Sequence, residues 1–451
     1  MDFKKLAQEN KQEAIELLTK LVKIDSVLDP STATPSMPFG KGINEALETF
    51  LEIAKNDGFD VENVDGYAGR IIYKGATDER IAILGHLDVV PTGEGCTNPP
   101  FSATILNNKM YGRGTTDDKG PTVAAYMGLK VLNNLGIKLN KTIELILGTD
   151  EETGWRGIAH YQEKYKLPDV GFSPDAEFPL INGEKGILRL ILKGKGCSDF
   201  TLAGGNIFNA VIGKAKVTTK INLVDEFSDY LEEHNLQGDC EFDGTNYIYT
   251  LVGVTAHAMQ PQEGINAGTH LANFLSKYIN HPTLKLISSN IHEDYNLCKL
   301  GLKTTHPVMG IITNNIGIMD FNEECSKFTF DIRYPIGFEF KNFETALRNI
   351  LSIYDVTFEV VEDKEPHYVS EDDDLVKTLY GIYVKHTGDT VHKPRSIGGG
   401  TYARALKHGV AFGMEEVDKP SVCHMTDEYV DLDKFEEALG IYMEAIYELG
   451  K

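Results

Sequence analysis

The sequence has 451 residues, of which 41% are hydrophobic and 25% are charged, a composition typical of globular proteins. This length exceeds what one ordinary hydrophobic core serves, so we expect two domains. The net charge of −23 argues against nucleic acid and membranes as partners, because polyanions repel an acidic protein.

The cysteines and the N-terminal segment bear on the cellular compartment. The six cysteines are widely spaced and form no CxxC pair, so the sequence predicts no disulfide framework. The first residues, Met1–Leu6, contain no apolar signal segment, and no run of eighteen apolar residues occurs anywhere. We therefore expect a cytoplasmic protein.

The N-terminal part alternates between helical and strand-like patterns. Apolar residues recur with helical spacing over residues 10–24 and 44–56, which predicts two amphipathic helices. Strands are expected at residues 70–73, 81–84 and 142–147. A helix at residues 122–135 separates the last two strands. This order predicts an α/β sheet with helices packed on both faces.

The middle of the chain has a different pattern, and the C-terminal part returns to the first. Strands are expected at 186–192, 247–254 and 327–333, and helices at 267–278 and 342–354. After residue 374 we expect helices at 374–386, 401–408 and 433–449 and a strand at 410–412. We therefore predict a discontinuous α/β domain, residues 1–185 and 365–451, with an α+β domain inserted at residues 186–364.

A histidine and a carboxylate follow the apolar run at 81–84. His86 and Asp88 are two residues apart, so on a strand both side chains point to the same face. That geometry suits an imidazole that binds a metal while an acid orients it. A half-buried histidine beside an acid at the end of a strand is also common without a metal, so the pair alone decides little.

Three acidic clusters follow, each after a strand-like run or a glycine turn. They contain Asp117-Asp118, Asp150-Glu151-Glu152, and Asp175 with Glu177. Each has an ordinary explanation, as a helix N-cap or a solvated acidic turn. Open α/β sheets, however, bind ligands at the carboxyl ends of their strands, where all these acids fall. Together with His86 and the later His424, they predict a metal-dependent hydrolase.

An ordered set of segments along nearly the full length resembles one family. The segments are Gly85–Pro91, Tyr111–Gly114, Asp117–Pro121, Gly148–Trp155, Phe172–Glu177, Gly253–Pro261, Arg333–Pro335, Glu365–Val369, Ile397–Tyr402 and His424. They resemble the co-catalytic dinuclear metallopeptidases that include carboxypeptidase G, succinyl-diaminopimelate desuccinylase and aminoacylase, and most of all the PepV-type bacterial dipeptidases. The resemblance implies a zinc-exopeptidase type of catalytic domain, with a mixed sheet flanked by helices, and an inserted α+β lid.

The resemblance also implies a ligand set for two divalent ions per subunit. His86 and Asp175 would bind one ion, Glu152 and His424 the other, and Asp117 would bridge them. Asp118 would adjoin the bridge across a cis peptide bond, and Asp88 would orient His86. Zinc is the first expectation for the metal, and manganese or cobalt would suit the same ligands.

Further roles follow from the same resemblance. Glu151 would be the general base that takes a proton from the attacking water. His257, on the inserted domain, would donate to the developing oxyanion, which implies domain closure; a structural role is the ordinary reading of such a histidine. Residues expected to bind substrate are Arg333, Asn209, Gly400 and Thr401, with a surface salt bridge as the alternative for Arg333.

The resulting hypothesis is a metal-dependent dipeptidase that hydrolyses unblocked dipeptides. The alternative is an N-acyl-amino-acid deacylase or desuccinylase that uses the same metals. A third hypothesis is a catalytically inactive, metal-free binding protein. The predicted insert of about 180 residues is as long as that of the monomeric dipeptidases in this family, so we expect a monomer.

Overall fold

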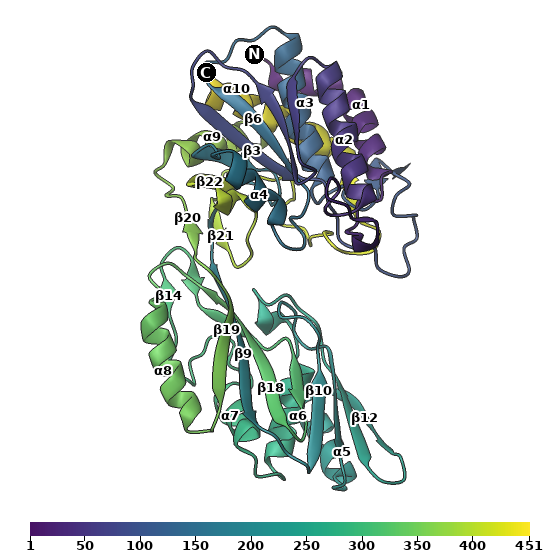
Figure 1. Ribbon diagram of the computed structural model, residues 1–451, viewed down its shortest axis with the longest axis vertical. Helices are drawn as coiled ribbons and strands as arrows, with labels where there is room; N and C mark the ends of the chain where they lie inside the picture. The colour runs from purple at the N-terminus through teal and green to yellow at the C-terminus, as the bar shows by residue number, and fades with distance from the viewer. The chain divides into compact units, whose positions relative to one another are not determined.

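The computed structural model describes all residues, 1–451, and the chain divides into two units (Figure 1). The first unit contains residues 1–182, 369–395 and 400–451, and the second contains residues 183–368 and 396–399. The chain leaves the first unit within strand β8 (Ile181–Glu184) and returns after β20 (His367–Tyr368). The sequence placed the insert at 186–364 and assigned residues 396–399 to the α/β domain.

The first unit is built on a mixed sheet. Its strands in spatial order are β1 (Asp60–Val64), β2 (Ala68–Tyr73), β6 (Thr142–Gly148), β3 (Arg80–His86), β7 (Val170–Ser173) and β22 (His408–Ala411). The ladders β3–β6, β3–β7 and β7–β22 are parallel, whereas β1–β2 and β2–β6 are antiparallel. The parallel strands therefore end at one common edge, which is where ligands bind in such sheets.

Helices cover both faces of this sheet, because its strands carry apolar side chains on both faces. Ile81 and Ile83 of β3 join one core cluster, and Ala82 and Leu84 join another. The helices of the first unit are α1 (Phe3–Val22), α2 (Lys41–Asn56), α3 (Lys119–Asn134), α4 (Arg156–Lys164), α9 (Asp374–Thr387) and α10 (Leu432–Gly450). The first core contains residues of α1, α2, α3, α9 and α10, and the second contains those of α4. The predicted α/β class is confirmed.

The second unit contains an antiparallel sheet with helices packed on it. Its strands in order are β12 (Gln237–Phe242), β13 (Tyr247–Val252), β11 (Lys214–Thr219), β10 (Phe200–Gly204), β17 (Met319–Phe321), β18 (Cys325–Tyr334), β9 (Gly186–Lys195) and β19 (Thr357–Lys364), with β16 (Thr313–Asn315) beside β18. The helices are α5 (Val224–Glu233), α6 (Ala267–Ser276), α7 (Pro282–Asn290) and α8 (Phe340–Ser352). All four contribute side chains to one core with Leu188, Leu190 and Leu192 of β9.

Short elements complete the chain. They are the strands β4 (Thr104–Leu106), β5 (Lys109–Tyr111), β14 (Thr305–His306), β15 (Gly310–Ile311), β21 (Arg395–Ile397) and β23 (Tyr429–Asp431), and the 3₁₀ turns Pro30–Thr32, Pro261–Glu263 and Tyr402–Ala405. No helix in the structure is both long and apolar enough to span a membrane.

The helix predicted at 401–408 was wrong. Residues Tyr402–Ala405 form a single 3₁₀ turn, and β22 already begins at His408. The parallel pairing of His408 with Val170 and of Val410 with Phe172 extends the sheet by one strand. Pairing of this short segment in the sheet therefore outweighs its local helical pattern.

Candidate metal centre

The acidic clusters named from the sequence meet at the carboxyl ends of the parallel strands. His86 is the last residue of β3, Glu151 and Glu152 follow β6, and Asp175 follows β7. Asp117 lies next to Asp118, the N-cap residue of α3. His424 lies in the loop before β23.

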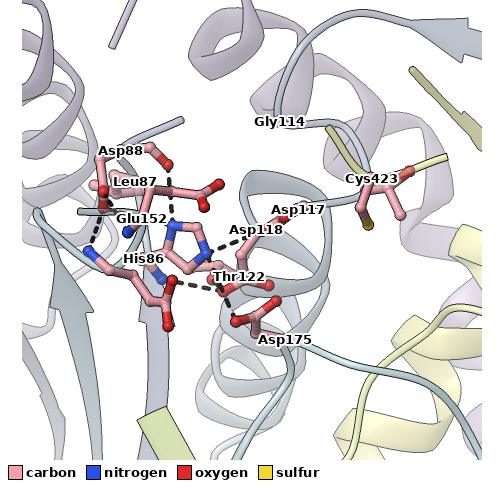
Figure 2. A network of polar contacts seen from close by, with 12 residues as sticks. His86, Leu87, Asp88, Gly114, Asp117, Asp118, Thr122, Glu152, Asp175 and Cys423 are labelled. Atoms are coloured by element: carbon pink, nitrogen blue, oxygen red, sulfur yellow. Dashed lines mark hydrogen bonds and ion pairs between the residues drawn. The ribbon is translucent and has the colours of Figure 1, made fainter. Parts of the chain in front are cut away.

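Asp117 lies between the two histidines, with one carboxylate oxygen toward each. Its Oδ1 is 3.0 Å from His86 Nε2, and its Oδ2 is 2.9 Å from His424 Nε2. His86 Nε2 is also 3.8 Å from Asp175 Oδ2, and His424 Nε2 is 3.2 Å from Glu152 Oε2. Figure 2 shows His86 with Asp117 and Asp175 on one side and Asp88 on the other. The five proposed ligands thus form two groups that share one carboxylate.

This donor set fits divalent metal ions. Imidazole nitrogens and carboxylate oxygens are the ligands that zinc, manganese and cobalt accept. His86, Asp117 and Glu152 offer ligand atoms within 4.8 Å of one another, and so do His86, Glu151 and Asp175. The second group shows that Glu151, assigned as a base, also lies close to the cluster.

Charge makes the cluster costly without cations. Burial raises the pKa of Glu151 to about 8, and the neighbouring Glu152, Asp117 and Asp88 add to the rise. Burial and the charge of Asp117 raise the pKa values of both Glu152 and Asp175.

The two histidines show the complementary effect. Hydrogen bonds to Asp117 and Glu152 raise the pKa of His424 to about 11. Burial opposes protonation of His86, but Asp117 and Asp88 outweigh it and raise the pKa of that imidazole. Burial likewise opposes ionisation of Asp117, yet His424 and His86 lower its pKa. The site therefore favours positive charge beside Asp117, as a cation site must.

Asp88 positions two parts of the centre at once. Its backbone carbonyl oxygen is 3.0 Å from His86 Nδ1, and its carboxylate Oδ1 is 3.5 Å from the same nitrogen. The carboxylate oxygens accept the backbone N–H groups of Glu151 at 3.1 Å and of Glu152 at 3.0 Å. Asp88 thus orients His86 mainly through its main chain and fixes the turn that carries Glu151 and Glu152.

Asp88→Asn is therefore expected to weaken zinc binding about 10- to 100-fold, the usual cost of losing a group that orients metal ligands. The amide would present an NH₂ group to a backbone N–H that now meets a carboxylate oxygen. Titration calorimetry of the metal-stripped protein with zinc measures this. Asp65→Asn is the control, because Asp65 pairs only with His160 and Lys164 at the surface. Equal zinc affinity in Asp88→Asn and wild type would contradict the assigned role.

Asp118 holds the backbone of His86 and the first turn of α3 together beside the same centre. Its Oδ2 accepts the backbone N–H of His86 at 3.0 Å and the hydroxyl of Thr122 at 2.7 Å, and its side chain is fully buried. The peptide bond between Asp117 and Asp118 is cis, as the resemblance implied.

Two further residues hold parts of this centre in position and were not predicted from the sequence. The buried carboxylate of Glu428 accepts the backbone N–H groups of Gly114, Thr116 and Asp117 and a bond from Arg113. The buried ring of Tyr402 packs edge-on against His86, at 6.3 Å between centroids. Both lie near segments that carried the resemblance, which was the only signal for them.

Glu151, the proposed general base, contacts a tryptophan. Trp155 donates its indole N–H to Glu151 Oε1 at 3.1 Å, and its ring packs at 5.0 Å against that of Tyr402. The aromatic pair thus bounds the space around Glu151. Aromatic rings beside a carboxyl exclude water from it, and this desolvation raises its pKa.

The remaining predicted residues fall in both units. Gly400 and Thr401 belong to the first, where the Thr401 hydroxyl accepts the Ala403 N–H and begins the 3₁₀ turn. His257 and Asn209 belong to the second, where the Asn209 carbonyl accepts the N–H of Ala258. His257 Nδ1 accepts the N–H of Met259 at 3.2 Å, which places the ring proton on Nε2.

Arg333, also in the second unit, is buried and tightly held. It bonds Asp331 through Nε at 2.5 Å and Nη2 at 3.2 Å, and it donates through Nη1 to the Gly398 carbonyl at 2.9 Å. Arg333 thus does form the salt bridge that was the alternative, but a buried one, since only 2% of this residue is exposed. Of its five N–H donors, these bonds use three.

Comparison with known proteins defines the class. Residues 82–448 match the model of peptidase family M20/M25/M40, so the chain belongs to this family of hydrolases. It is 38% identical over 479 residues to the Beta-Ala-Xaa dipeptidase of Lactobacillus delbrueckii subsp. lactis, which covers 100% of this chain and 99% of that protein.

Solved structures show the same fold at low sequence identity. Human carnosine dipeptidase 1 has a TM-score of 0.60 and 15% identity, with 99% of this chain and 98% of that chain covered. The aminoacylhistidine dipeptidase of Vibrio alginolyticus has a TM-score of 0.58 and 16% identity, with 97% and 96% covered. These structures show the fold, and the family match together with the 38% identical relative confirms the family expected from the sequence.

Proposed function

We propose that this protein is a dipeptidase that hydrolyses unblocked dipeptides at a centre of two divalent ions. The observation that carries the proposal is the position of Asp117, with one oxygen toward His86 and the other toward His424. A bridging carboxylate between two histidine-containing groups is what a two-metal site requires. The dipeptidase name of a relative that is 38% identical over the whole chain supports the substrate class.

The proposed ligands are His86 and Asp175 for one ion, Glu152 and His424 for the other, with Asp117 shared. Zinc is the first choice, and manganese or cobalt fits the same donors. When bound, two such ions acidify a water and polarise the scissile carbonyl. The three carboxylates contribute −3 against +4 from the ions, which leaves room for one hydroxide in a neutral centre.

Glu151 is the proposed general base. It takes a proton from the attacking water and passes it to the leaving amine, so one carboxyl serves both steps. Burial favours its neutral form, and two bound cations would favour its ionised form. A carboxyl balanced in this way can both accept and return a proton near neutral pH.

His257 and Arg333 are the proposed substrate contacts in the second unit. The tautomer of His257 carries its proton on Nε2, the form needed to donate to an oxyanion. Arg333 is oriented by Asp331 and retains two N–H donors for the free carboxylate of a dipeptide. We assign weaker contacts to Asn209 and to the backbone at Gly400 and Thr401.

His257→Ala is expected to lower kcat about 10²- to 10³-fold, because it removes one oxyanion donor, with a smaller effect on KM. Steady-state kinetics with a dipeptide measures this. His306→Ala is the matched control, since His306 lies in the same unit and its Nδ1 likewise accepts a backbone N–H, that of Val308. A KM effect alone would show that His257 binds substrate without stabilising the oxyanion.

The substrate proposal is tested by product analysis on a panel of dipeptides beside N-acetyl and N-succinyl amino acids. We expect release of free amino acids from the unblocked dipeptides. Cleavage of only the acylated compounds would make the protein a deacylase instead. Cleavage of neither set with added zinc, manganese or cobalt would favour an inactive binding protein. We further propose a monomer, which light scattering of the purified protein tests.

A further inference from the structure

A second group of potential metal ligands lies in the second unit and plays no part in the proposed reaction. His270 is on α6, and His292 and Glu293 come after Ile291, the C-cap residue of α7. Figure 1 labels both helices. One ligand atom from each of these three residues lies within 4.8 Å of the others. The group thus joins two helices that pack against each other in the core of this unit.

The hydrogen bonds around His270 fix which nitrogen is available. The Tyr230 hydroxyl lies 3.1 Å from His270 Nδ1 and 3.2 Å from the His270 carbonyl oxygen. It also accepts a bond from Asn273 at 3.1 Å. Because Tyr230 occupies Nδ1, Nε2 is the ring nitrogen open to an ion.

His292 has the same arrangement with a different partner. Its Nδ1 lies 3.3 Å from the Thr269 hydroxyl, which is also 3.1 Å from the Asn266 carbonyl oxygen. Nε2 is again the ring nitrogen open to an ion. Histidine ligands of metals are usually held in this way, with one nitrogen fixed by a neighbouring acceptor and the other on the ion.

Both rings are buried and held close together. Each residue is only 6% exposed, and the rings pack edge-to-face with centroids 4.5 Å apart. The two imidazoles are therefore fixed beside each other, so that one ion could contact both.

The surrounding charges are mixed. Glu293 is exposed and supplies one negative charge, and the ring of His234, at the end of α5, is 5.8 Å from that of His270. Lys299 donates to the carbonyl oxygen of His292 at 2.6 Å, and Lys277 lies 5.1 Å from the centre of the Tyr230 ring. The ammonium of Lys299 is thus bound to the main chain of His292 and not to its ring.

We propose that His270, His292 and Glu293 form a further metal site for a zinc-class divalent ion, with His234 or water as the fourth ligand. Two imidazoles and one carboxylate favour zinc, nickel or cobalt over calcium and magnesium, which prefer all-oxygen sites. The ion would cross-link α6 to the segment after α7 and stabilise the second unit. This site does not depend on the proposed function.

The test is zinc binding by the full-length protein, stripped with a chelator and then equilibrated with buffered zinc. Metal analysis is expected to find one zinc fewer per chain in His292→Ala than in wild type. Glu293→Gln, at an exposed position, is expected to raise the dissociation constant of one zinc at least tenfold. It also carries the test if His292→Ala fails to fold. His306→Ala is the matched control and should bind as wild type does.

Equal zinc content and affinity in wild type, His292→Ala and Glu293→Gln would overturn the proposal. Glu293→Gln should in addition lose the part of the zinc-induced rise in Tm that the second unit contributes, while dipeptide hydrolysis stays at the wild-type rate. If wild type hydrolyses no dipeptide but still loses one zinc in His292→Ala, the proposed function fails and this site stands.

Discussion

Glu151→Gln is expected to retain bound metal and to lose about 10²- to 10⁴-fold in kcat, the range for a positioned general base. Glutamine has the same shape and can still accept the indole N–H of Trp155, which now bonds Glu151 Oε1 at 3.1 Å. It cannot, however, take a proton from water. Steady-state kinetics with a dipeptide and metal analysis of the same preparation measure the two effects separately.

The control for this substitution is Glu163→Gln on α4, which removes an exposed carboxylate that pairs with His160 of the same helix. It should leave kcat unchanged. Glu151→Gln that keeps more than a tenth of wild-type kcat would exclude Glu151 as the base. Loss of metal together with activity would instead make Glu151 a ligand, a role its distance from His86 and Asp175 allows.

Chelation of the metals is expected to abolish hydrolysis and to destabilise the first unit. Ligands that bind only the folded state stabilise it by about 4 kcal/mol at a thousand times their dissociation constant. Removal of the ions loses this free energy of stabilisation. For a unit of this size, Tm should therefore fall by at least about 5 °C. Scanning calorimetry with and without chelator measures the shift, and hydrolysis measured in parallel should return when zinc, manganese or cobalt is added.

The matched control is Asp175→Asn, which removes one proposed ligand without adding bulk. Its Tm should respond less to chelation than that of wild type, because one ion is already weakly held. Full hydrolysis in the presence of a strong chelator, with no change in Tm, would contradict a metal-dependent reaction.

The structure brings together the ligand candidates named from the sequence, whereas several of the helices were not predicted. His86 and Asp175 stood out because His86 ends a short apolar strand, Asp175 follows another, and both strands run parallel to the same edge. The short helices α4, α5 and α7 went unpredicted, because in each of them only a few apolar residues are buried. Their stability comes from packing on the sheets, which local pattern does not show.

Contacts between distant segments could not be read from the sequence. Glu428 and Asp117 are 311 residues apart, and no periodicity connects them. The role of the Asp88 carboxylate on the Glu151–Glu152 turn depends on β3 and β6 being neighbours in the sheet. His270 and His292 are brought together only by the packing of α6 against α7, so no short motif marks them.

We propose that Asp117 bridges two divalent ions, and anomalous diffraction from zinc-soaked crystals would locate these ions. We expect two anomalous peaks on either side of Asp117, one against His86 and Asp175 and the other against Glu152 and His424. A single peak, or none within ligand distance of Asp117, would contradict it.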